Sequence, residues 1–260
     1  MFTWPQGNRS SQGEFFLMKN AEFKIENISF PRLLLGSSPW IGAGQFGEKA
    51  LEYYQRFYLQ PENITELIVH FVRNCAPSLH LCLMEPLVKA VLEAEKLLGQ
   101  RLPLIATLFA ENQHQQLEWI KQLQVKVLML HAQTTDRLYR RELEQFCSFC
   151  RAFGIIPGFA THNPGITIPR IDEMELDFPV YLAPLNPSGA HVHPDLPSAL
   201  KAIKETPKTV IGMKTLRAGE IPPRAAFAFA LERVEGIAVG MTEKAEIEEN
   251  RELFQIWLES

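Results

Sequence analysis

Short apolar runs alternate with longer amphipathic segments along most of the chain, and this alternation restricts the fold more than any other feature. A short apolar run between turn residues is typical of a buried strand, and an apolar stripe with helical spacing is typical of a packed helix. Strands that alternate with helices build parallel sheets. We therefore predict an α/β fold with strands over Arg32–Ser38, Ser78–Leu83, Leu102–Phe109, Val125–Ala132, Ile155–His162, Val180–Asn186, Lys208–Lys214 and Gly236–Met241.

The number of these units favours a closed barrel. Roughly eight βα units fill about 230 residues, which matches a single-domain (β/α)8 TIM barrel. An open doubly wound sheet has the same alternation, but its glycine fingerprint lies between the first strand and a helix. Gly42–Gly47 has the fingerprint spacing without opening a clear helix. We predict helices over Ile64–Ala76, Glu85–Gly99, Asn112–Gln124, Tyr139–Gly154, Leu196–Thr206, Pro222–Val234 and Thr242–Glu259, with Thr167–Leu176 ambiguous.

The N-terminal segment differs from the rest in composition. It is rich in Gly, Ser, Asn and Gln and has no period, so we expect a flexible leader or a short hairpin over residues 1–27, and the barrel domain over residues 28–260. No apolar run reaches the length of a membrane-spanning helix, and Phe15–Met18 is too short for the core of a signal peptide. We expect no membrane association and a cytoplasmic location.

Charge and cysteine content narrow the partners. The formal net charge is -4, with acidic and basic residues interspersed, so no basic field is available to bind nucleic-acid phosphates. We expect a small-molecule ligand and no nucleic acid. The four cysteines are expected to be reduced thiols in a chain of this kind.

Polar residues at the ends of the predicted strands are the candidates for the site, because active sites of such barrels lie at the carboxyl ends of the strands. His131 and His162 each end an apolar run directly, and imidazole acts as acid or base near neutral pH. We predict both as catalytic. Residues that accompany them at strand ends are predicted to bind substrate: Ser37, Trp40, Thr161, Asn163 and Asn186.

A metal site is not expected. It would need a third ligand beside His131 and His162, from Glu85, Asp136 or His80, and no metal-ligand spacing marks such a set. His191 and His193 are separated by one residue but lie in a stretch rich in Pro and Gly, where a solvated loop is the simpler interpretation.

The C-terminal half resembles the aldo/keto reductases. Val210–Asn250 is similar to the family's last two βα units, VLMLHAQTTD to its strand-four segment with the catalytic histidine, FGIIPGFATHNPG to its segment with the pattern G-x-S/T-x-H, and VYLAPLNP to its strand six. The resemblance covers roughly residues 125–258. It implies a (β/α)8 barrel and reduction of a carbonyl with a nicotinamide cofactor.

The catalytic residues of that family are mostly absent from this chain. The resemblance implies an Asp, a Tyr, a Lys and a His, with the Tyr as proton donor, and only the His is matched, by His131. The second-strand segment, SLHLCLMEP, has neither Asp nor Tyr, and the lysine position falls near Leu108. The chain therefore looks like a divergent member without the usual proton donor.

The resemblance also implies cofactor contacts. Glu249 and Asn250 match the family's pair near the adenine, Thr242 falls among its phosphate-contacting residues, and Lys214 and Arg217 offer positive charge to a phosphate. Glu246 stands where NADP-preferring members often have Arg, and a carboxylate repels a 2′-phosphate. We therefore expect NAD to be a possible cofactor and NADP to be disfavoured.

Three functions remain open on the sequence. The first is an enzyme that transforms a small molecule at the C-terminal face of the barrel without tyrosine-dependent carbonyl reduction, with His131 as acid or base and with His162 and Asn186 orienting the substrate. The second is an NAD-dependent oxidoreductase in which His131 or His80 replaces the proton donor. The third is a small-molecule-binding protein without catalysis. Whether the barrel is an enzyme, and which substrate and oligomeric state it has, are not fixed by the sequence.

Overall fold

The eight apolar runs form the parallel strands of one closed barrel in the computed structural model, which describes residues 21–110 and 113–260. Each barrel strand pairs with its neighbour along the chain, and the last strand pairs with the first, in the order β10-β3-β4-β5-β6-β7-β8-β9. The predicted (β/α)8 fold class is confirmed. The strands are β3 Leu33–Gly36, β4 Leu79–Cys82, β5 Pro103–Leu108, β6 Gln124–Leu130, β7 Ile156–Ala160, β8 Val180–Pro184, β9 Thr209–Met213 and β10 Gly236–Gly240.

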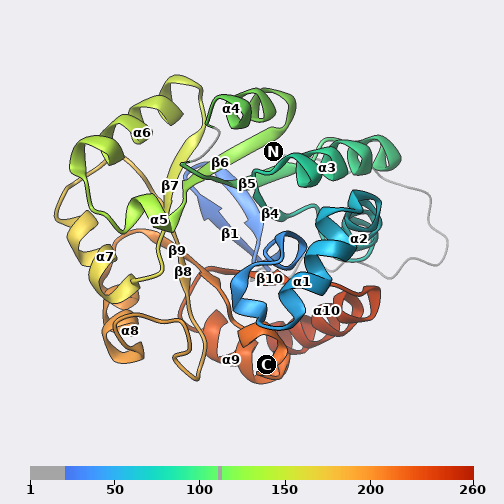
Figure 1. Cartoon of the computed structure of the whole chain (residues 1–260). Coiled ribbons are helices and arrows are strands. Elements are labelled where there is room, and N and C mark those ends of the chain that lie inside the picture. Colours follow the sequence, from blue (N-terminus) through green and yellow to red (C-terminus); the bar gives the residue numbers. More distant parts are fainter. Residues whose placement is uncertain (1–20, 111–112) are drawn as a thin grey trace.

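Helices surround the barrel, and a helix returns the chain from the end of each strand to the start of the next (Figure 1). Their local signals are ordinary ones: Pro61 opens α2, and Gly99 ends α3 in a left-handed conformation with φ 66°. The segment left ambiguous in the sequence is helical in part. The helices are α1 Lys49–Tyr53, α2 Pro61–Asn74, α3 Glu85–Leu98, α4 Gln113–Gln122, α5 Ala132–Thr135, α6 Arg140–Ala152, α7 Pro164–Asp172, α8 Leu196–Glu205, α9 Pro223–Leu231 and α10 Lys244–Glu259.

The apolar side chains form two layers. The larger layer lies between the strands and the surrounding helices, and the smaller one fills the inside of the barrel. Gly158 on β7 makes room for the inner layer, because a Cβ there would come within 2.2 Å of the Met129 sulfur. The lower part of the barrel is therefore solid, as expected for strands whose inward side chains interlock.

A short antiparallel hairpin closes the end of the barrel where the strands begin. It consists of β1 Glu22–Ile25 and β2 Ile28–Pro31, and its buried side chains Phe23, Ile25 and Phe30 belong to the inner apolar layer. Phe23 lies so close to the start of β10 that a Cβ on Gly236 would meet its ring at 2.6 Å. We infer that this hairpin is part of the barrel domain; the rest of the expected leader, residues 1–20, lies outside the described residues.

Arg32 connects the first barrel strand to the end of the chain. Its guanidinium donates to three backbone oxygens: Nε to Glu235 at 2.7 Å and Nη2 to Leu231 and Val234 at 2.6 and 2.9 Å. The same guanidinium lies over the ring of Trp257 in α10, 4.7 Å from its centroid. This arginine therefore fixes the junction at which β10 closes the barrel against β3.

The connection between β3 and α2 is the longest loop on the site side of the barrel. It contains the short turns η1 Pro39–Ile41 and η2 Gly44–Phe46, helix α1, and the wider turn η3 Tyr54–Tyr58. Buried Trp40 donates its Nε1–H to the backbone oxygen of Met241 at 3.1 Å, which ties the connection to the loop after β10. In the described ranges, no helix combines the length and the hydropathy needed to cross a membrane.

Candidate active site

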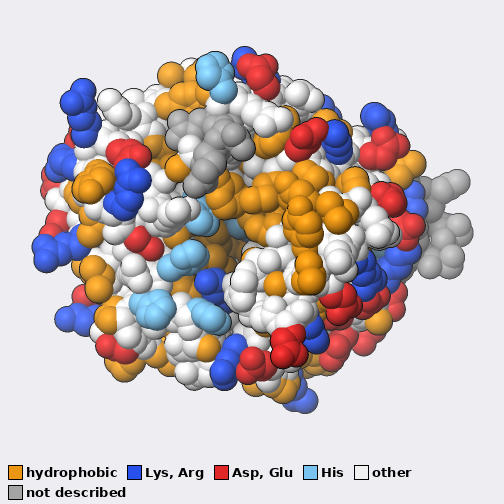
Figure 2. Space-filling model, viewed as in Figure 1, with side chains coloured by type: hydrophobic (Ala, Val, Ile, Leu, Met, Phe, Trp, Pro, Cys, Tyr) orange, Lys and Arg blue, Asp and Glu red, His pale blue; other side chains and the backbone are white. Residues whose placement is uncertain are grey.

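A cavity of about 430 Å³ opens at the carboxyl ends of the strands, on the barrel axis, and we call it the axial cavity. Its volume is in the range of small-molecule sites. Figure 2 shows histidine side chains gathered along one side of the hollow on this face, with hydrophobic side chains on the other side. The described residues that line it include Ser38, Ile41, Gln45, His80, Cys82, Thr107, Phe109, His131, His162, Leu182, His191, Met213 and Lys214.

His131 and His162 face each other at the ends of β6 and β7. Their ring centroids are 5.8 Å apart, the planes are nearly perpendicular, and His131 also stacks on Phe109 at 4.5 Å. The backbone N–H of Gln133 donates to Nδ1 of His131 at 3.2 Å. An acceptor at Nδ1 places the proton of the neutral ring on Nε2, so His131 is a hydrogen-bond donor at Nε2.

Asp136 positions the segment that bears His162. Its carboxylate accepts from the Thr161 hydroxyl at 2.5 Å, the Thr167 hydroxyl at 2.8 Å and the backbone N–H of His162 at 2.9 Å. The Thr161 oxygen in turn accepts from the backbone N–H of Asn163 at 2.9 Å. Asp136 is thus occupied by the protein's own donors and holds the turn after β7 in place.

The surroundings of His162 and Lys214 oppose positive charge. Burial, together with charge repulsion from Lys214, His131 and His193, lowers the pKa of His162 to about 4, although Asp136 opposes part of this shift. Burial also lowers the pKa of the Lys214 ammonium. The His162 ring is therefore neutral at neutral pH, beside a lysine whose charge is poorly solvated.

His80 lies deeper in the same cavity. Its Nε2 is 2.8 Å from the Thr107 hydroxyl, and burial, with a smaller contribution from His131, lowers its pKa to about 4. The sequence segment around His80 is the one in which the proton-donating tyrosine was expected and not found. A neutral imidazole and a hydroxyl occupy this part of the cavity.

A second space of about 300 Å³ runs from the axial cavity over the ends of β9 and β10, and we call it the β9–β10 groove. The two spaces are adjacent, because they share part of their lining. The shared residues are Ser38, Gln45, His80, Met213 and Lys214. The groove is completed by described residues that include Lys49, Tyr53, Thr215, Arg217, Thr242, Glu246, Glu249 and Asn250.

Two buried oxygen atoms in the groove wall have no hydrogen-bond partner among the described residues. They are Oγ1 of Thr215, whose residue is 1% exposed, and Oδ1 of Asn250, whose residue is 3% exposed. A buried polar atom without a partner is costly, and native proteins have few of them. Both residues line the groove, so these atoms lie within its wall.

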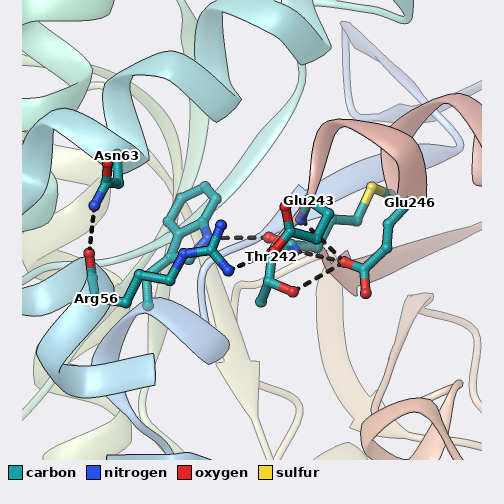
Figure 3. Close-up of polar contacts among 7 residues, drawn as sticks. Arg56, Asn63, Thr242, Glu243 and Glu246 are labelled. Carbon is teal, nitrogen blue, oxygen red and sulfur yellow. Dashed lines mark hydrogen bonds and ion pairs between the residues drawn. The ribbon is translucent and has the colours of Figure 1, made fainter. Parts of the chain in front are cut away.

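Carboxylates cap the helix that forms the far wall of the groove. The side chain of Glu246 accepts from the backbone N–H and hydroxyl of Thr242 at 2.6 and 3.1 Å and from the N–H of Glu243, at the N-terminus of α10 (Figure 3). Glu243 pairs with Arg56 of the β3–α2 connection. The anion-attracting end of α10 is thus occupied by the protein's own carboxylates.

The structure brings many of the predicted site residues together. His131 and His162 both line the axial cavity, and the residues predicted to contact a cofactor all line the β9–β10 groove: Lys214, Arg217, Thr242, Glu249 and Asn250. Lys214 lines both spaces. Its backbone is left-handed, with φ 58°, a conformation that a non-glycine residue adopts at some energetic cost.

Residues predicted to bind substrate are instead engaged with the protein. The Ser37 oxygen accepts from the backbone N–H of Cys82 at 2.8 Å, and Trp40 is buried against Met241. Buried Asn186 holds the loop after β8, donating to Ala190 and Lys214 oxygens and accepting from Ser188. Thr161 and the backbone N–H of Asn163 are bonded around Asp136, and none of the five predicted residues is among the described residues that line the axial cavity or the β9–β10 groove.

Several lining residues escaped the sequence reasoning. His191 lines the axial cavity from the loop after β8, although its Pro- and Gly-rich neighbourhood indicated a solvated loop. Thr215 was overlooked next to Lys214. A signal existed for His191, because the loop after a barrel strand lies at the site whatever its composition. In the described residues, no group of three or more His, Cys, Asp or Glu side chains is arranged to hold a metal ion.

Comparison with known proteins shows what the barrel is similar to. No protein-family model matches the sequence, and a search of curated proteins found no match. Solved structures do match. A thermostable aldo-keto reductase in complex with the inhibitor epalrestat superposes with a TM-score of 0.67 at 12% identity, covering 90% of this chain and 94% of that one. The chain has an aldo-keto reductase-like fold.

Two further structures agree. A protein described as an aldo-keto reductase from Pseudomonas aeruginosa matches with a TM-score of 0.63 at 14% identity, over 87% of this chain and 90% of that one. An aldo-keto reductase from a Medee basin deep-sea metagenome library matches with a TM-score of 0.61 at 12% identity, over 90% and 88%. At identities this low, the structural similarity establishes the fold alone. The chemistry follows only from the residues of the site.

Proposed function

We propose that the protein is an enzyme that holds a small molecule in the axial cavity and a nicotinamide dinucleotide in the β9–β10 groove, with histidine in place of the missing tyrosine. The observation that carries this proposal is that the two spaces are adjacent and share part of their lining, at Lys214 in particular. A site that must place two molecules in contact requires such adjacency. A purely structural barrel has no need of it.

The groove residues fit a dinucleotide in several respects. The unpartnered oxygens of Thr215 and Asn250 can accept hydrogen bonds, and Lys214 and Arg217 supply positive charge along the same wall. A nicotinamide dinucleotide, when bound, donates or accepts hydride. Glu246 is fixed at the N-terminus of α10 and repels a 2′-phosphate, which favours NAD over NADP.

The chain's own residues divide the remaining work. The hydrogen bond at Nδ1 places the proton of the neutral His131 ring on Nε2, so we assign it to donate from Nε2 to an oxygen of the substrate. We assign proton transfer to His162, which faces His131 and whose protonation depends on the charge placed next to it. This exchanges the roles that the sequence indicated, where His131 was the acid or base.

A titration of the purified full chain with NADH and NADPH tests the cofactor, followed by nicotinamide fluorescence. We expect saturable binding that is tighter for NADH. Thr215→Val removes only the unpartnered hydroxyl and should weaken NADH by about two- to tenfold, the worth of one neutral hydrogen bond. Thr209→Val, at the opposite end of β9, is the matched control and should leave binding unchanged. Failure of both nucleotides to bind would rule the proposal out.

The second candidate is a small-molecule-binding protein without catalysis. It is favoured by the low pKa values of His80 and His162. Burial keeps both rings neutral at neutral pH as long as no anion lies in the cavity. His131→Gln separates the two candidates. A ligand affinity that survives this substitution, together with the absence of any turnover in the parent protein, would favour binding alone. For either candidate we propose the cytoplasm as the compartment, supported by the four buried, free cysteines.

A further inference from the structure

Apart from the Cys82 thiol, whose pKa burial raises to about 11, the ionisable side chains that line the axial cavity are all bases. They are one ammonium and four imidazoles, contributed by Lys214, His80, His131, His162 and His191. No Asp or Glu is among the described residues that line the cavity. Within residues 21–110 and 113–260, Lys214 forms no ion pair with a carboxylate. A site of one chemical sign in a low-dielectric surrounding selects ligands of the opposite sign.

Three of these bases lie on one arc of the barrel, whereas His131 follows β6 and His80 lies on β4, deeper in the cavity. His162 follows β7, His191 lies in the loop after β8, and Lys214 follows β9, so consecutive strands supply these three. The opposite arc supplies apolar surface, from Ile41 in the β3–α2 connection and Phe109 after β5. Figure 2 shows the same division, with histidine on one side of the hollow and hydrophobic side chains on the other.

The protein itself does not neutralise this arc. The groups that act on His162 are His131 from the end of β6, Lys214 from β9, His193 from the loop after β8, and Asp136 after α5. Asp136 is the single carboxylate of this set, and three donors already occupy it. A negative ligand would stabilise the Lys214 ammonium and the protonated form of His162, which is an interaction that a neutral ligand cannot supply.

We propose that the substrate of the axial cavity is a small organic acid, whose carboxylate lies between Lys214, His162 and His191 and whose apolar part lies against Phe109 and Ile41. This inference rests on the proposed function, since it names the substrate class of the same site. It also predicts coupling to protons. An anion beside His162 raises the pKa of the ring, so binding takes up protons and tightens as the pH falls from 8 to 6, where the carboxylate stays ionised.

The test is calorimetric binding of phenylacetate and of its neutral analogue phenylacetamide to the full chain, in two buffers of different ionisation enthalpy. We expect the acid to bind at least about tenfold more tightly than the amide, as one charge-assisted hydrogen bond provides, with net proton uptake. Lys214→Met should remove that preference and leave the amide affinity unchanged. Lys201→Met, on the exposed face of α8, is the control and should behave like the parent protein.

Two outcomes overturn the inference: equal affinity for acid and amide in the parent protein, or an acid preference that persists in Lys214→Met. Because Lys214 also lines the groove, His191→Gln provides a variant confined to the axial cavity, expected to weaken phenylacetate and not NADH. NADH binding without acid preference defeats this inference alone. Acid preference without NADH binding defeats the proposed cofactor and leaves the substrate class standing.

Discussion

The two ends of the barrel are built on opposite principles. Where the strands begin, the β1–β2 hairpin fills the opening with the side chains of Phe23, Ile25 and Phe30, and all three are apolar and buried. Where the strands end, histidines and a lysine line an open cavity, and their burial lowers the pKa of several of them. The closed end stabilises the fold. The open end holds buried ionisable groups whose charged forms are unfavourable until a ligand binds.

This contrast separates stability from function within one set of strands. A single strand contributes to both ends of the barrel. On β9, Thr209 begins the strand away from the site, and Lys214 directly follows the last residue of the strand, at the cavity. Substitutions at the two ends should therefore have different signatures. Changes at the closed end should alter unfolding, and changes at the open end should alter binding and pH dependence.

The largest effect is expected from Phe30→Ala at the closed end. Phe30 is 1% exposed, and truncating a fully buried Phe destabilises a protein by about 3–5 kcal/mol. Urea unfolding measures the loss, and NADH and phenylacetate affinities of the folded variant should stay near the parent values. Phe153→Ala, at a residue 60% exposed, is the control and should change stability by less than about 0.5 kcal/mol. A parallel fall in ligand affinity would show that the two ends are coupled.

Residues at the open end should make the free energy of unfolding fall at acidic pH. The pKa of His80 is about 4 in the folded protein and near 6.5 in the unfolded chain, so between these values only the unfolded chain takes up the proton. Stability is therefore complete above pH 6.5 and falls as the pH drops towards 4, by up to about 3 kcal/mol for this residue.

His80→Gln isolates this contribution, because glutamine can still bond to Thr107 but does not titrate. Unfolding free energies of the parent and the variant, measured by urea at several pH values, should differ in slope between pH 6.5 and 4. Identical slopes would mean that His80 takes up its proton in the folded state as readily as in the unfolded one.

Asp136→Asn should affect both properties moderately. The amide keeps the shape of the carboxylate but loses its charge and presents N–H to donors, which leaves buried groups unpaired at a cost of about 1–3 kcal/mol. Since His162 is held by this residue, phenylacetate affinity should fall as well. Asp177→Asn, at an exposed position paired with Arg151, is the control and should leave phenylacetate affinity unchanged. A variant of Asp136 with full affinity would argue against its positioning role.

The smallest effect is expected from Arg56→Gln. The pair Arg56–Glu243 joins the β3–α2 connection to α10, but its side chains are 39% and 53% exposed, so the pair should contribute less than about 1 kcal/mol. A double-mutant cycle with Glu243→Gln measures the coupling. A coupling well above 1 kcal/mol would show that this corner of the open end stabilises the fold after all.

The barrel was predictable from the sequence and the lining of its site was predictable only in part. Strands such as β3 and β8 have no charged residue because both faces are buried, and this signal is strong. At a strand end, however, neighbouring residues point to different sides. Ser38 lines the cavity and Ser37 is buried against Cys82; the sequence offers no means of choosing between adjacent positions.

Loop residues were harder still. His191 reaches the axial cavity through the path of the loop after β8, which depends on Asn186 and its bonds to Ala190 and Lys214. Such a path is set by tertiary contacts and leaves no periodic pattern in the sequence. The helix α5 was likewise hidden, because its four residues lie between a strand and a longer helix and are too few to show a period.

The pairing of β3 with β10 determines when the barrel can close during synthesis of the chain. The first barrel strand pairs with a strand that is synthesised near the end, and the three bonds from Arg32 reach residues 231–235. During synthesis, β3 therefore remains an open sheet edge until almost the whole chain has emerged. An unpaired apolar edge invites contact with other nascent chains. This protein's exposure to aggregation is concentrated in the interval before its last strand arrives.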